Sequence, residues 1–150
     1  METIKEKMIF LIGKGFLGEK IVSVFKKKGI KVITAGIDGR VDYSLDMTDG
    51  QSLIYLFKDL NPDIVLLPAG ITNVEYCEAE KEKAIEVNVE GTRNVVDSCR
   101  AFNSKLVFFS TDYVFDGLKG SYSEKDSVNP LNFYGKTKVQ GEKIVEGLEN

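Results

Sequence analysis

The stretch Met8-Ile-Phe-Leu-Ile-Gly-Lys-Gly-Phe-Leu-Gly18 decides the predicted fold. Its first part, Met8–Ile12, is a continuous apolar run of the kind found in strands that are buried on both faces. Three glycines follow at G-x-G-x-x-G spacing, and a helical pattern over 16–28 begins within them. A strand, a glycine loop and a helix in this order predict a dinucleotide-binding turn, and a bare turn that needs glycine for its backbone angles is the alternative.

Each glycine of this loop has a separate expected role. Gly13 permits the tight turn, Gly15 lets a pyrophosphate approach the backbone, and Gly18 lets the helix pack close to the sheet. An acidic group that binds the ribose hydroxyls is expected about 20 residues further on, and Asp38 is the candidate. Arg40 could instead meet a 2′-phosphate, so NAD and NADP both remain open as cofactors.

Outward from the loop, short apolar runs alternate with longer segments of helical periodicity. The expected strands are 8–12, 31–35, 41–45, 63–67 and 105–109, and the expected helices are 16–28, 49–60 (capped by Thr48 or Asp49), 81–102 and 134–148. This alternation predicts right-handed βαβ units, and hence an α/β, Rossmann-type, doubly wound parallel sheet. Such a fold normally adds strands after the last helix, so we expect a sheet truncated before its last strands. Ser110–Pro130 shows no regular element, and a loop of that length is usually functional.

The composition excludes several classes of protein. The 150 residues are 43% hydrophobic and 29% charged, which is typical of one globular domain. The net charge is −3, and no basic stripe or bilayer-length apolar run indicates binding to nucleic acid or membrane. The chain has no histidine and only two cysteines, so we expect neither a metal site nor a Ser/His/Asp triad. A reducing cytoplasm is the expected compartment.

Tyr134 and Lys138 form the first candidate catalytic pair. They stand four residues apart, so both side chains share one face of the predicted helix. An ammonium close to a phenol favours the phenolate, and we therefore expect a lowered pKa for Tyr134. Such a tyrosine can exchange a proton with a carbonyl or alcohol oxygen while a hydride moves. A surface tyrosine packed on a lysine stem is the alternative interpretation.

Two further polar positions follow from the expected topology. The strand 105–109 ends at Ser110-Thr111-Asp112, and carboxyl ends of parallel strands face the ligand crevice. Thr111 and Asp112 are therefore expected to point at the cofactor site, where a hydroxyl can bind a substrate carbonyl. Asn88 lies within a predicted helix, and we expect either a cross-brace to a neighbouring strand or a proton-relay partner.

The stretches Ser110–Gly117 (STDYVFDG) and Pro130–Lys138 (PLNFYGKTK), together with the glycine loop, resemble the extended short-chain dehydrogenase/reductase superfamily. Within it they are most similar to the dTDP-4-dehydrorhamnose reductase family. The resemblance implies reduction of the 4-keto group of a nucleotide-linked deoxysugar by NADPH or NADH. It implies that Tyr134 is the acid/base, Lys138 its pKa modifier and ribose ligand, and Thr111 the substrate hydrogen-bond donor, with Asp112 also touching the sugar.

The same resemblance implies where the cofactor lies. Gly15, Phe16 and Leu17 would line the pyrophosphate, Asp46 and Met47 the adenine, and Ala69, Gly70 and Ile71 the nicotinamide. Two departures stand beside this assignment. The family loop is usually G-x-x-G-x-x-G, whereas Ile12 precedes Gly13 here, and Leu67-Pro68-Ala69-Gly70 replaces the family's Asn-Ala-Ala.

The family also continues for roughly as long again beyond the position of Asn150, with the last strands of the sheet and a substrate lobe. We therefore expect 1–150 to be a dinucleotide-binding domain that forms part of a longer enzyme. The strand 105–109 would then have an open apolar edge, covered by the missing lobe or by a second copy in a homo-oligomer. A chain reduced to a cofactor-binding module is the alternative.

Two other functions fit most of the same residues. The regulatory beta subunit of methionine adenosyltransferase has a similar scaffold and implies a non-catalytic NADP-binding partner. Thr111 and the stretch 72–75 favour the reductase over it. A sugar-nucleotide epimerase or dehydratase uses the same tyrosine and lysine. A dehydratase needs a carboxylate pair beside the threonine, and Asp112 supplies only one carboxylate.

Overall fold

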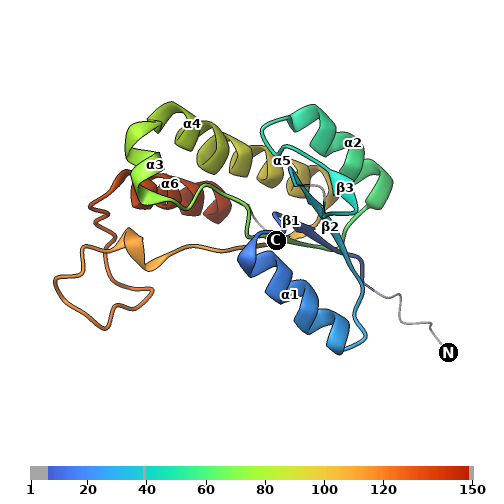
Figure 1. Ribbon diagram of the computed structural model, residues 1–150, viewed down its shortest axis with the longest axis horizontal. Coiled ribbons are helices and arrows are strands. Elements are labelled where there is room, and N and C mark those ends of the chain that lie inside the picture. Colours follow the sequence, from blue (N-terminus) through green and yellow to red (C-terminus); the bar gives the residue numbers. More distant parts are fainter. Residues whose placement is uncertain (1–6, 39, 149–150) are drawn as a thin grey trace.

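The computed structural model describes residues 7–38 and 40–148 of the chain, so Gly39 and both ends of the expected 1–150 domain lie outside the described residues. Five parallel strands form one sheet in the order β3-β2-β1-β4-β5 (Figure 1). They are β1 (Ile9–Ile12), β2 (Val32–Gly36), β3 (Tyr43–Ser44), β4 (Ile64–Leu67) and β5 (Lys105–Phe108). This order, with the first strand at the centre, confirms the predicted Rossmann-type α/β fold.

Helices cover both faces of the sheet. In Figure 1, α1 (Phe16–Lys27) lies on one face, and α2 (Gly50–Leu60), α5 (Thr92–Phe102) and α6 (Phe133–Glu146) lie on the other. Asp49 caps α2, because its carboxylate accepts the backbone N–H groups of Gln51 and Ser52. None of the helices within 7–38 and 40–148 is long and apolar enough to cross a membrane.

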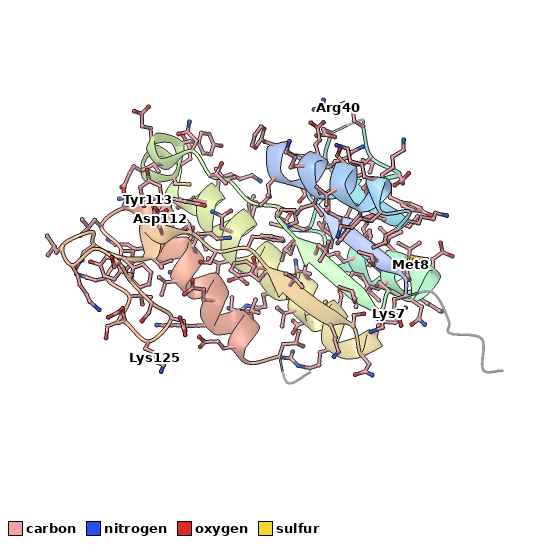
Figure 2. All side chains as sticks on the ribbon, turned by 90° about the horizontal axis from the view of Figure 1, so that it is seen from below. Lys7, Met8, Arg40, Asp112, Tyr113 and Lys125 are labelled. Atoms are coloured by element: carbon pink, nitrogen blue, oxygen red, sulfur yellow. The ribbon has the colours of Figure 1, made fainter. Side chains whose placement is uncertain are left out.

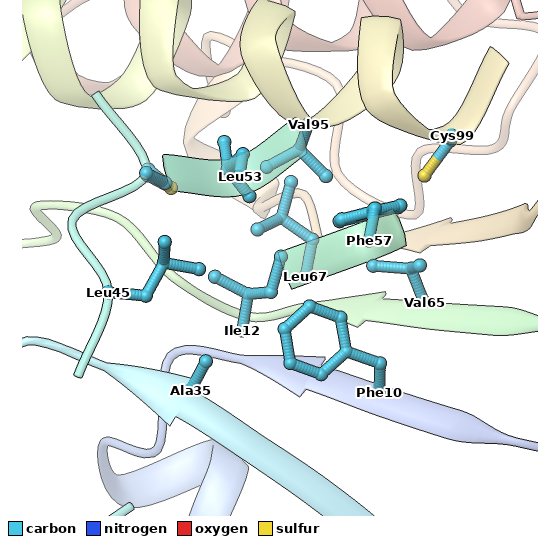
Figure 3. Close-up of a cluster of buried hydrophobic side chains, with 11 residues drawn as sticks. Phe10, Ile12, Ala35, Leu45, Leu53, Phe57, Val65, Leu67, Val95 and Cys99 are labelled. Atoms are coloured by element: carbon cyan, nitrogen blue, oxygen red, sulfur yellow. The ribbon is translucent and has the colours of Figure 1, made fainter. Parts of the chain in front are cut away.

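The main core fills the space between the sheet and helices α2 and α5 (Figure 3). Phe57 of α2 is fully buried, and its ring meets that of Phe10 edge to face with 5.7 Å between the centroids. Val65 and Leu67 of β4 meet Val95 of α5 in the same cluster. The apolar runs of the central strands therefore hold the sheet rigid below the loops that follow it.

The predicted helix 81–102 is interrupted in the structure. Its first turn is α4 (Lys81–Ile85), a wider π-helical segment η1 (Glu86–Gly91) follows, and α5 completes it. In an unbroken helix over 81–102, Ile85 would share the buried face of Val89 and Val96, but it is 36% exposed because the wider turn changes the phase of the helix. Two short helices were not predicted, α3 (Val74–Ala79) and the 3₁₀ turn η2 (Asp112–Val114).

The α1 face of the sheet is sparsely covered. Leu17 and Val24 share the apolar stripe of α1, yet each is 45% exposed. The reason is that α1 is the one helix of the described residues on this face (Figure 1). β5 lies at the edge of the sheet and pairs with β4 alone among the described strands, and Val107 is 44% exposed. The expected apolar edge is therefore present.

Candidate active site

The glycine loop runs between β1 and α1 in a backbone conformation that other residues avoid. Gly13 has φ +100°, and a Cβ there would lie 2.5 Å from the Cα of Ala69. A Cβ on Gly18 would lie 2.3 Å from the carbonyl oxygen of Gly13, so a glycine is needed for the close packing of α1. Gly15 has open space where a Cβ would stand. Two glycines thus serve the fold, and the third leaves its backbone approachable.

The first turn of α1 lacks a side-chain cap. Asp49, Asn73 and Asn132 cap α2, α3 and α6 with side-chain oxygens, but Gly15 caps α1 without one. The first N–H groups of a helix have no partner within it, and together with the helix dipole they attract an anion. The start of α1 is therefore suited to a phosphate group, as the glycine spacing predicts.

A cleft of about 520 Å³ opens at the carboxyl ends of β1, β2 and β4, beside this loop. A second hollow of about 330 Å³ adjoins it and shares Gly13, Gly15, Ala69 and Gly70. Of the predicted cofactor residues, the first is lined also by Asp38, Asp46, Met47 and Ile71, and the second by Phe16, Leu17, Gly18, Tyr134 and Lys138. The fold thus gathers all of the predicted cofactor residues around two adjoining hollows.

The residues at the β2 end are held by local contacts. The Asp38 carboxylate accepts the backbone N–H of Arg40 at 3.2 Å. The Arg40 guanidinium pairs with Glu19 at 3.1 Å, and the Lys14 ammonium donates to the Arg40 carbonyl oxygen. An acidic group and basic groups therefore stand together where a ribose or its phosphate would lie.

Asp46 and Met47 follow β3 and line the same cleft in different ways. Asp46 is exposed, and its carboxylate accepts the N–H and the hydroxyl of Thr48 at 2.9 and 2.8 Å. Met47 belongs to the core and packs against Gly91, where a Cβ would lie 2.9 Å from its Cγ. Asp46 offers a polar rim, whereas Met47 offers an apolar floor.

Tyr134, the first residue after the start of α6, is buried with its hydroxyl toward Thr111. Burial raises the pKa of Tyr134, and a hydrogen bond with the Thr111 side chain opposes that rise. The Tyr113 ring meets the Tyr134 ring edge to face at 6.0 Å. The expected lowering of the Tyr134 pKa is wrong for this structure, because desolvation outweighs every group that favours the phenolate.

Lys138 is the other member of the candidate pair, and its buried ammonium lies over the ring of Phe108. The side chain is 6% exposed, and its Nζ stands 4.0 Å from the centre of the Phe108 ring. Burial lowers the pKa of Lys138 to about 8, and the negative charge of Glu142 opposes this. The one-turn spacing thus places both residues in one hollow.

Thr111 and Asp112 begin the turn η2 after β5. The Thr111 hydroxyl donates to Asp112 at 3.3 Å and accepts the backbone N–H of Tyr113 at 3.3 Å. Figure 2 shows Asp112 and Tyr113 at the end of the molecule opposite Met8. Thr111 bonds to Tyr134, which lines the second hollow, but neither Thr111 nor Asp112 lines either hollow, and Asp112 is exposed.

Asn88 is a buried cross-brace. Its Oδ1 accepts the N–H of Ile71 at 2.7 Å, and its Nδ2 donates to the Ile71 carbonyl at 2.9 Å and to the Thr137 hydroxyl at 3.0 Å. The Thr137 hydroxyl in turn donates to the carbonyl oxygen of Tyr134. The side chain therefore ties the loop after β4 to the first turns of α6, which carry the tyrosine.

Several residues of the cleft were not predicted from the sequence. Some directly follow a strand or belong to the glycine loop and could have been found by the strand-end rule, namely Lys14, Ile37, Pro68 and Ser110. Tyr76 of α3 and Lys83 of α4 also line the cleft. Tyr76 reaches it through α3, which was not predicted, and Lys83 through the start of the predicted helix 81–102, whose packing against the cleft the sequence pattern does not show.

The fold and the site define a Rossmann-type, dinucleotide-binding class of domain with a tyrosine and a lysine at the mouth of the cleft. Residues 7–150 match the family described as the RmlD substrate binding domain, and the chain belongs to that family. This confirms the resemblance drawn from the sequence.

The similar proteins are of two kinds, named as a reductase and as a subunit of methionine adenosyltransferase. The chain is 33% identical to a dTDP-4-dehydrorhamnose reductase of Aggregatibacter actinomycetemcomitans, over 87% of this chain and 44% of that protein. It is 30% identical to methionine adenosyltransferase 2 subunit beta of Rattus norvegicus, over 99% of this chain and 45% of that protein. A crystal structure of dTDP-4-dehydrorhamnose reductase from Bacillus anthracis in complex with NADP aligns with TM-score 0.89 and 28% identity, covering 99% of this chain and 52% of that one. The chain thus spans about half the length of these relatives.

Proposed function

We propose that this chain is the NAD(P)-binding part of a reductase that acts on the 4-keto group of a nucleotide-linked deoxysugar. The observation that carries the proposal is that Tyr134 and Lys138 share one hollow with the glycine loop, while Thr111 is hydrogen-bonded to Tyr134. A relative named dTDP-4-dehydrorhamnose reductase, similar over most of this chain, supports the substrate class.

The glycine loop fits the proposed cofactor. Gly15 leaves its backbone open, the start of α1 has no side-chain cap, and the adjoining cleft of about 520 Å³ ends beside Asp38. When bound, a reduced nicotinamide supplies the hydride. Ala69, Gly70 and Ile71 form the wall against which its ring would be held, and Asn88 fixes Ile71.

The state of Tyr134 fits reduction of a carbonyl. As the carbonyl becomes an alkoxide, its oxygen needs a proton, so the acid must be protonated beforehand. Burial raises the pKa of Tyr134 and therefore keeps that proton on the phenol at neutral pH. The Thr111 hydroxyl, which lies beside the phenol, would turn its single proton from Asp112 to the same carbonyl oxygen and so align it with Tyr134.

The rest of the proposal concerns the whole protein. The sparsely covered α1 face and the open edge at β5 would be covered by further chain of the length that the relatives have, or by a second copy. Cys77 and Cys99 are buried free thiols, which fits a cytoplasmic setting.

Cofactor binding is tested by thermal unfolding of the chain with NADPH and, separately, with NADH. A ligand that binds only the folded state at 100 times its Kd adds about 2.7 kcal/mol, which raises Tm by several degrees. The cofactor that gives the larger rise at equal concentration is the preferred one. An unchanged Tm at millimolar NADPH and NADH would contradict the proposal.

The catalytic role is tested by Tyr134→Phe in the longest natural polypeptide that carries this sequence. Turnover of a 4-keto nucleotide sugar should fall by roughly 10²–10⁴-fold, because the acid is removed. Cofactor affinity should change little, since the ring remains in place. Unaltered turnover would refute the role of Tyr134.

A non-catalytic NADP-binding subunit is the second candidate. The observation that favours it is the state of the pair: burial raises the pKa of Tyr134, and the Lys138 ammonium stands 4.0 Å from the centre of the Phe108 ring. A relative named methionine adenosyltransferase 2 subunit beta also covers 99% of the chain. NADPH binding without any hydride transfer to 4-keto nucleotide sugars would favour this function.

A further inference from the structure

The face of α6 that carries Tyr134 and Lys138 continues by one more turn to Glu142. Residues four apart on a helix are neighbours, so the three side chains form a row. The Ser110 hydroxyl, two residues beyond the end of β5, donates to the Glu142 carboxylate. This contact joins residues 32 apart in sequence and fixes the carboxylate at the end of the row.

Lys138 is enclosed between this carboxylate and the Phe108 ring. Its Nζ lies 4.0 Å from the ring centre, and the face of an aromatic ring attracts a cation. Gly141 makes the arrangement possible, because a Cβ there would lie 2.8 Å from the Cζ of Phe108. A side chain at 141 would therefore push the ring away from α6 and from the ammonium.

Burial disfavours the charged form of Lys138, because the ammonium loses contact with water. Burial lowers its pKa to about 8, and the negative charge of Glu142 raises it again. Among the described residues, Glu142 is the one charged group that acts on the ammonium, while the neighbouring polar groups are Ser110, Thr72 and Tyr134. Without the carboxylate, desolvation would be opposed by the aromatic ring alone.

The carboxylate acts at a distance. Lys138 and Glu142 form no direct ion pair in the described part of the chain, and Glu142 is engaged by Ser110 instead. The N–H donors of Lys138 therefore remain available to the hollow that it lines together with Tyr134 and the glycine loop.

We propose that Glu142, held in place by Ser110, is a positioning residue that keeps Lys138 charged at the wall of the dinucleotide cleft. This inference rests on the proposed function in one respect: the group that the charged Lys138 would bind is a ribose hydroxyl or phosphate of the cofactor, whose oxygen would accept a hydrogen bond from the ammonium. The charge itself is a property of the chain alone and can be measured without substrate.

The test is a pH titration of Lys138 by NMR in the 150-residue chain with ¹³C-labelled lysine, in which Lys138→Arg assigns the signal. The wild-type midpoint should lie near 8. In Glu142→Gln, which keeps the shape of the side chain, the midpoint should move down by roughly 0.5–1 pH unit, because the opposing negative charge is gone. Ser110→Ala should move it in the same direction by less.

Two further variants separate charge from structure. Glu146→Gln removes an exposed carboxylate on the same row of α6, two turns away from Lys138, where solvent screens its charge, and should leave the midpoint in place. Glu142→Asp keeps a negative charge and should restore most of the wild-type midpoint. An unchanged midpoint in Glu142→Gln, with thermal unfolding like that of the wild type, would overturn the inference. An equal shift in Glu146→Gln would overturn it as well.

A second arm reports on the proposed function. The NADPH affinity of Glu142→Gln should be about three-fold below wild type at pH 8, where fewer molecules carry the charge, and equal to it at pH 6. A shifted Lys138 midpoint without this difference would sustain the role of Glu142 and count against Lys138 as a cofactor ligand. Equal Lys138 midpoints in wild type and Glu142→Gln would refute the role of Glu142, whatever the NADPH affinities of the two proteins are.

Discussion

Tyr134 and Lys138 show how far a spacing rule reaches. The i, i+4 pattern correctly placed both side chains on one face of α6 and in one hollow. It could not give their charge states, because these depend on burial and on Phe108, Thr111 and Glu142, which come from other turns and strands. Sequence therefore predicted the position of the pair, and only the packed structure gives its electrostatics.

Asn88 gives the sharpest prediction for a single side chain. Asn88→Ala removes the partner of the Ile71 N–H and the amide donor to the Ile71 carbonyl, which keeps only the weak Cys77 thiol donor, and a buried group left without a partner costs roughly 1–3 kcal/mol. Urea unfolding should show that loss, while Gln140→Ala, on an exposed position of α6, should stay within about 0.5 kcal/mol of wild type. Equal stability of the two variants would contradict the cross-brace.

At the level of elements, strands and helix caps were readable from the sequence, because they depend on neighbours in the chain. Asp49 caps α2 as one of two expected residues, and the apolar runs became the central strands. The π-helical segment η1 and the short helix α3 were missed. They are set by contacts such as that of Asn88 with Ile71, which no local pattern contains.

The glycine loop allows its structural and ligand roles to be tested apart. Gly18→Ala puts a Cβ 2.3 Å from a backbone oxygen and should destabilise the fold by roughly 1–3 kcal/mol. Gly15→Ala meets open space and should leave unfolding unchanged, yet reduce NADPH affinity about ten-fold or more, equal to about 1.4 kcal/mol. Denaturation and calorimetric titration of both variants measure this. Unimpaired NADPH binding by Gly15→Ala would place the phosphates elsewhere.

The loop between η2 and α6 is predicted to depend on pH through Asp116. Its carboxylate accepts hydrogen bonds from Tyr122, Asn129 and the N–H of Leu118, which lower the pKa of Asp116 to about 2. A folded-state pKa below the ordinary 3.8 gives stability that is present above pH 3.8 and is lost as pH falls toward 2. The ¹³C shift of the carboxyl group measures the midpoint. A midpoint at or above 3.8 would show that these bonds do not form in solution.

At the scale of the whole molecule, the order β3-β2-β1-β4-β5 brings the glycine loop, the β4 loop and α6 to one end of the sheet. Alternation of apolar runs and helical periods was enough to predict this, since parallel strands with right-handed crossovers leave few other arrangements. The cover over the β5 edge could not be predicted in the same way. It depends on contacts beyond this sheet, and the described residues leave Val107 exposed.

The central claim is that one cleft joins the glycine loop to Tyr134 and Lys138 and binds NAD(P). The most direct test is to map NADPH onto the ¹⁵N-labelled chain by amide NMR. At saturation, the account predicts that the shifted amides cluster in 13–18, 69–71 and 134–138. Saturating NADPH that shifts none of these amides, or only those around Arg93 and Arg100 on the far side of α5, would contradict it.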